Sequence, residues 1–122
     1  MRHATDLVSG TYGGDTLGLA AADAVLRTYQ ERDVIGELRT RGLALWDAFS
    51  LHAPATAKLE GTPQHWRLAM PDADALDRVL LTVARKSILM HRASNSMIAA
   101  MKVDEARYAG EVIGQAATEA LR

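Results

Sequence analysis

The sequence predicts an α+β domain in which helices cover one face of a small, mainly antiparallel sheet. In several segments apolar residues recur at three- and four-residue spacing, as they do on the buried stripe of a helix. Between the helices lie pairs of short extended segments separated by turn-forming residues, which is typical of antiparallel neighbours. The predicted order, ααββαββα, groups the strands in pairs and favours an α+β layer over alternating βαβ units.

The composition fits one modest core and excludes several classes of function. The chain has 122 residues, of which 48% are hydrophobic, and its 14 basic and 15 acidic residues give a net charge of −1. A balance of this kind provides no electrostatic footprint for nucleic acid or an anionic membrane. Cysteine is absent, so disulfides and thiolate metal sites are excluded and a reducing compartment, the cytoplasm, is expected. The nearly apolar run 17–26 is too short to span a bilayer.

The first predicted helix follows a glycine-rich loop. Asp15 or Thr16 caps it, and it continues to about Glu31. Its first half, residues 17–26, is apolar on almost every side, and such a helix is normally buried all round. A chain of this size can hardly cover it, so we expect another subunit or another domain to pack there. The simplest form is a homodimer with these helices at or near its interface.

A second, amphipathic helix is predicted from Asp33 to about Leu51. Charged residues occupy one side, and the segment His52-Ala53-Pro54 ends the helix because proline disfavours helical geometry in the residue before it. The other side carries an apolar stripe with three- and four-residue spacing: Ile35, Leu38, Leu45, Trp46 and Phe49.

A β-hairpin and a third helix come next. The predicted strands are residues 57–60 and 65–70, with the turn at Gly61-Thr62-Pro63. In this hairpin Trp66 is expected to be a core anchor or half-exposed. Asp72 or Asp74 then caps a helix that ends near Lys86. Its apolar stripe consists of Leu76, Val79, Leu80 and Val83.

Two more strands and a last helix complete the predicted domain. The strands are residues 88–91 and 96–101, on either side of a turn-prone segment at 92–95. Asp104 is expected to cap the last helix. One side of that helix is apolar: Ala109, Ile113, Ala116, Ala117 and Leu121.

One segment near the start resembles a known enzyme family. It reads Ser9-Gly10-Thr11-Tyr12-Gly13-Gly14-Asp15-Thr16-Leu17-Gly18-Leu19-Ala20-Ala21-Ala22. This string is similar to the segment that follows the cofactor lysine in class III pyridoxal-phosphate aminotransferases, on the glutamate-1-semialdehyde aminomutase branch. The run from Ser87 to His91, Asn95 and the Val103-Asp104-Glu105 step resemble the end of the same family. The resemblance implies that residues 1–31 are a phosphate-loop segment and connecting helix. Residues 32–122 would then be the C-terminal small domain of a fold-type I aminotransferase.

The resemblance implies a cofactor contact but no catalytic residue. By its match to the family, Gly10-Thr11 would contact the phosphate of a pyridoxal phosphate bound mainly by another chain. A hydroxyl and unhindered glycine N–H groups beside a helix start are suited to an anion. The family's Schiff-base lysine lies upstream of the matching segment. The three lysines of this chain, at 58, 86 and 102, are read as ordinary solvated side chains. We therefore expect no catalysis from the isolated chain.

Other candidate site residues are few. The resemblance places His91 and Asn95 in a loop near the substrate entrance, and Asn95 stands about where aminomutases carry a glutamate. This departure favours a relative that acts on another amine or keto substrate. The four histidines have no metal-ligand spacing, so no metal site is predicted: His3, His52, His65 and His91.

Two functions of different classes follow. In the first, the chain is the C-terminal portion of an aminotransferase and supplies a cofactor-phosphate contact and the substrate-entrance domain to a lysine-bearing large domain. In the second, it is a non-catalytic aminotransferase remnant that acts as a dimerisation or protein-binding module. The missing lysine favours the second hypothesis, and the intact Gly10-Thr11 and Gly13-Gly14 steps favour the first.

Overall fold

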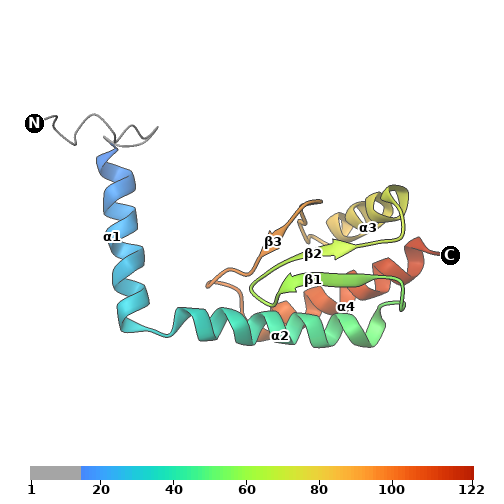
Figure 1. Cartoon of the computed structure of the whole chain (residues 1–122), viewed down its shortest axis with the longest axis horizontal. Coiled ribbons are helices and arrows are strands. Elements are labelled where there is room, and N and C mark those ends of the chain that lie inside the picture. Colours follow the sequence, from blue (N-terminus) through green and yellow to red (C-terminus); the bar gives the residue numbers. More distant parts are fainter. Residues whose placement is uncertain (1–14) are drawn as a thin grey trace, which may run out of the picture. The chain divides into compact units, whose positions relative to one another are not determined.

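The computed structural model describes residues 15–122, which form a small α+β fold (Figure 1). Contacts divide the chain into two units, one ending at Val34 and the other comprising Ile35–Arg122. Within the described residues the elements are α1 (Thr16–Glu31), α2 (Val34–His52), β1 (Lys58–Thr62), β2 (His65–Ala69), α3 (Ala73–Arg85), β3 (Asn95–Ser96) and α4 (Val103–Ala120).

The sheet of the second unit is antiparallel throughout, with strand order β1-β2-β3. Along β2 the side chains alternate: Trp66 and Leu68 are buried, whereas His65 and Arg67 are exposed. Successive side chains of a strand point to opposite faces, so one face of the sheet is covered and the other is open. The predicted α+β class and the antiparallel pairing are confirmed at this level.

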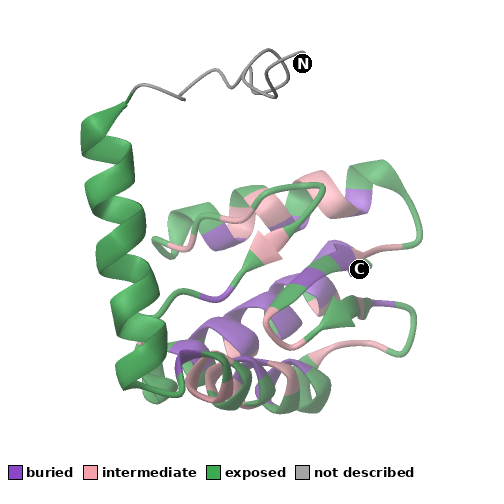
Figure 2. Cartoon of the chain, turned by 60° about the vertical axis from the view of Figure 1, so that its left-hand side comes forward, coloured by how far each residue is buried: buried purple, intermediate pink, exposed green. Residues whose placement is uncertain are grey.

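The covered face of the sheet packs on α2, α3 and α4. Purple, buried segments of these elements face one another in Figure 2. The core cluster takes Leu45 and Phe49 from α2, Val79 and Val83 from α3, and Ile113 from α4. Three members of the predicted stripes lie outside the core cluster: Ile35 is 63% exposed, Leu121 is 37% exposed, and Leu80 is half-buried but not packed against the cluster.

Two glycines of α4 allow its backbone to approach α2 closely. A Cβ added to Gly110 would lie 2.1 Å from the carbonyl oxygen of Leu45, and one added to Gly114 would lie 2.8 Å from that of Phe49. Because real Cβ atoms do not come so near to backbone atoms, glycine is required at Gly110 for this helix packing. The glycine pair therefore sets the distance between α2 and α4.

The predicted helix starts are partly confirmed. The carboxylate of Asp15 accepts a hydrogen bond from the Leu17 amide at 3.1 Å, and that of Asp72 accepts one from the Ala75 amide at 2.7 Å. The prediction that Asp104 caps the last helix is wrong. The cap residue is Lys102, two residues earlier, and Glu105 accepts a hydrogen bond from the Lys102 amide at 2.7 Å.

The hairpin turn lies two residues later than the sequence predicts. Residues 58–62 pair with residues 65–69, so Pro63-Gln64 forms the turn and Gly61 belongs to β1. Gly61 has a φ of 116°, and an added Cβ would lie 2.5 Å from the carbonyl oxygen of His65. The glycine thus serves a close approach within the hairpin rather than the turn itself.

The prediction of a strand at residues 88–91 is wrong. After α3 the Ser87 amide donates to the carbonyl of Ala84, and the Ile88 amide donates to that of Val83, with Ser87 at a φ of 61°. These two bonds and the left-handed residue form a Schellman motif, which reverses the chain direction. The following backbone is held by local loop bonds to Asn95 instead of a neighbouring strand.

The second predicted strand of this pair, residues 96–101, is also largely wrong. Only Asn95–Ser96 is a strand, paired with His65 and Trp66. One further bond, from the Met97 amide to the Gln64 carbonyl, extends this contact with the hairpin. At Met101 the amide then bonds the Ile98 carbonyl in a turn that leads into α4. The observed order is therefore ααββαβα over the described residues.

The C-terminal end of α4 is held by an arginine of α3. The Nε and Nη2 atoms of Arg78 both donate to the carbonyl oxygen of Ala120, at 3.1 and 2.9 Å. This carbonyl belongs to the last turn of α4, where no intrahelical donor is available. Arg78 therefore ties the end of the chain to α3.

Replacing Arg78 with methionine should lower the free energy of unfolding by about 1–2 kcal/mol, because a part-buried, charged double hydrogen bond is lost. Urea denaturation followed by tryptophan fluorescence measures the change. The matched control is Arg85→Met on the same helix, whose side chain is exposed and whose loss should cost less than about 0.5 kcal/mol. Equal losses in the two variants would contradict the role of Arg78.

Candidate functional site

The predicted phosphate contacts Gly10 and Thr11 lie outside the described residues. The described part begins with Asp15, whose side chain caps α1. The helix expected after the glycine-rich segment is therefore observed, with the predicted end at Glu31.

No residue of α1 is buried. Its apolar side chains face solvent, and the exposed fractions are 79% for Leu17, 63% for Leu19, 52% for Val25 and 62% for Leu26. In proteins most of the stability of a helix comes from packing of its apolar face rather than from intrinsic propensity. We therefore expect α1 to be stabilised by contacts from outside residues 15–122.

His91 and Asn95, the predicted substrate-entrance residues, are brought together in one closed loop. The His91 amide donates to the Asn95 side-chain oxygen at 2.7 Å, and the Asn95 side-chain nitrogen donates to the His91 carbonyl at 3.0 Å. Inside this loop the Ala93 amide donates to Nδ1 of His91 at 3.1 Å. The Asn95 side chain is thus used to hold the loop, and the neutral His91 ring carries its proton on Nε2.

Two further contacts fix the position of this loop. Arg92 forms an ion pair with Asp77 of α3, and Nδ1 of His65 lies 2.8 Å from Oγ of Ser96, next to the loop. The loop borders a shallow hollow of about 230 Å³ on the hairpin. Asn95 therefore acts on the shape of this region through the backbone of His91.

Replacing Asn95 with alanine should open the loop, since both hydrogen bonds to His91 are lost. Hydrogen exchange of the His91 amide should become faster by several-fold, because both bonds are exposed and each contributes about 0.5–1 kcal/mol. The Asn95→Asp variant keeps an acceptor for this amide but loses the donor to the carbonyl, so its exchange rate should fall between the two. An unchanged rate in Asn95→Ala would contradict the role given to this side chain.

The three lysines lie apart on the second unit. All are exposed: Lys58 begins β1, Lys86 follows the last residue of α3, and Lys102 precedes α4. None of them has a hydrogen bond from its side-chain nitrogen or an ion pair within residues 15–122. This distribution agrees with the reading of these lysines as solvated side chains.

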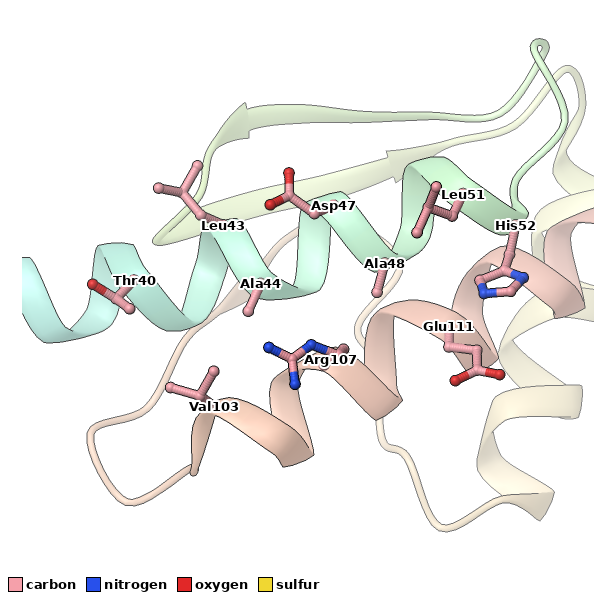
Figure 3. Close-up of a pocket in the computed structure, with 10 residues that line it drawn as sticks. All are labelled: Thr40, Leu43, Ala44, Asp47, Ala48, Leu51, His52, Val103, Arg107 and Glu111. Atoms are coloured by element: carbon pink, nitrogen blue, oxygen red, sulfur yellow. The ribbon is translucent and has the colours of Figure 1, made fainter.

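A groove of about 430 Å³ runs along the contact between α2 and α4 (Figure 3). We call this site the α2–α4 groove. Ala44 and Ala48 of α2 lie on its inner side, with Leu43, Leu51 and Val103 around them. Small side chains one turn apart leave the hollow between the two helices, because the backbones are held close while the side chains do not fill the surface.

Charged and polar side chains stand around this apolar groove. In Figure 3 the carboxylate of Asp47 and the guanidinium of Arg107 lie at the same level along it, on α2 and α4 respectively. One to two turns further along, His52 of α2 and Glu111 of α4 also lie at one level. At the first level the acidic residue is on α2 and the basic residue is on α4. At the second level the basic residue is on α2 and the acidic residue is on α4.

Sequence reasoning did not identify the α2–α4 groove. The signal for it is present in the four-residue repeats Ala44/Ala48 and Gly110/Gly114, which mark a small-residue helix contact. Apolar periodicity alone does not reveal this feature, because alanine and glycine contribute little to the hydrophobic stripe.

Neither a metal site nor a membrane span is found in the part of the chain that the structure describes. No group of three or more potential metal-ligating side chains is present among residues 15–122. None of the helices found there is both long enough and apolar enough to cross a bilayer. Comparison of the chain with protein-family models, with curated proteins and with solved structures finds no match.

Proposed function

We propose that this chain is the C-terminal portion of a class III pyridoxal-phosphate aminotransferase-like protein. It would supply a cofactor-phosphate contact and the substrate-entrance domain to a lysine-bearing partner, and it would be inactive alone. The observation that carries the proposal is the apolar helix α1, which has no buried residue and follows directly on the segment that resembles the family's phosphate loop. Such a helix is suited to a large domain that lies outside this chain.

Two features of the second unit support this assignment. Its small α+β fold with an antiparallel sheet has the fold class that the resemblance implies for the small domain. In addition, the loop of His91 and Asn95 is a well-held surface structure, as a substrate-entrance element requires. The amine donor and acceptor would be bound by the assembled protein.

The chemistry of the assembly would be transamination. Pyridoxal phosphate supplies an electron sink that lets an amino group pass from donor to acceptor. The role of this chain would be to hold the phosphate through Thr11 and to border the substrate entrance with His91. Asn95 would position His91.

Native mass spectrometry of the protein purified from its own source, with pyridoxal phosphate present, tests this proposal. A complex with a second, lysine-bearing polypeptide and a bound cofactor mass is the expected result. In that complex Thr11→Ala should weaken cofactor retention by about 10- to 100-fold, because a hydrogen bond to a charged group contributes about 1.5–3 kcal/mol. Thr28→Ala, which removes an exposed hydroxyl of α1, is the matched control and should leave retention unchanged.

The alternative is a non-catalytic remnant that acts as a dimerisation or protein-binding module. The same exposed helix α1 favours it, since a dimer can also cover apolar side chains. A cofactor-free homodimer in the mass spectrum, insensitive to Thr11→Ala, would support this alternative and overturn the first proposal.

A further inference from the structure

We draw no further inference here: the strongest candidate, the open apolar hollow of about 480 Å³ that Leu89, Ile98 and Tyr108 border between the loop after α3 and the helix α4, is an exposed face, and nothing in the structure of residues 15–122 shows what covers it.

Discussion

Replacing Trp66 with alanine should lower the free energy of unfolding by about 3–5 kcal/mol, the largest effect expected for a single residue of this chain. Trp66 is only 4% exposed, and it stands in β2 between β1 and β3, opposite Gly61 and Asn95. Its side chain belongs to the core cluster that joins the sheet to the helices. Truncation leaves a cavity and also removes apolar area that only this central strand supplies.

Urea denaturation followed by far-ultraviolet circular dichroism measures this loss. Total stabilities of small domains are about 5–15 kcal/mol, so the Trp66→Ala protein should lose a large fraction of its stability. Trp66→Phe is the matched control. It keeps an aromatic ring in the core and removes an indole N–H that is buried without a partner in the described structure, so its loss should be about 1 kcal/mol. Similar losses for both variants would contradict a packing role for the ring.

Gly110→Ala should destabilise the chain by about 2–3 kcal/mol, although alanine is the better helix former by about 1 kcal/mol. The added Cβ would lie 2.1 Å from the carbonyl oxygen of Leu45 and 2.9 Å from its carbonyl carbon. These are backbone atoms of α2 and cannot rotate away. To relieve the overlap, α2 and α4 would have to separate and loosen the core around Ile113.

Gly114→Ala is the internal comparison for this prediction. Its nearest atoms would be the Phe49 carbonyl oxygen at 2.8 Å and Cβ of His52 at 2.9 Å, so the overlap is smaller and the expected loss is about 1 kcal/mol. Thermal or urea unfolding of the two variants shows which of them loses more stability. If Gly110→Ala is as stable as the wild type or more so, the close approach of the two helices is not what holds this part of the core.

The two large predictions concern different kinds of packing. Trp66 fills space between the sheet and the helices, so its removal creates a cavity. Gly110 provides space between two backbones, so its replacement creates an overlap. Both act on the second unit, and neither changes α1, which has no buried residue.

The helices could be predicted well from the sequence. Three local signals were confirmed. They are the helix caps at Asp15 and Asp72, the end of α2 shortly before Pro54, and the apolar stripe with Val79 and Val83. The first hairpin was also recognised, since its two strands are neighbours along the chain. These features depend on interactions within a few residues, which one sequence is sufficient to specify.

The second strand pair and the candidate site could not be predicted in the same way. Residues 88–91 have the apolar composition of a strand, but a Schellman motif and the Asn95 side chain hold them as a loop. The relation of His91 to Asn95 was predicted only as a shared loop near a substrate entrance. In the structure the Asn95 side chain bonds the backbone of His91. The spacing of four residues does not show which of the two side chains makes these bonds.

The sequence by itself determined the α+β class, the helices with most of their limits, the first hairpin and an apolar α1 that the described residues do not bury. Only the tertiary structure decided the length of β3, the loop at His91 and the α2–α4 groove with its paired charges. The physical reason is the range of the interactions. Caps, turns and apolar periodicity act between neighbours in the chain, whereas the groove depends on Gly110 meeting Leu45, and β3 on Asn95 meeting Trp66, across segments that only folding brings together.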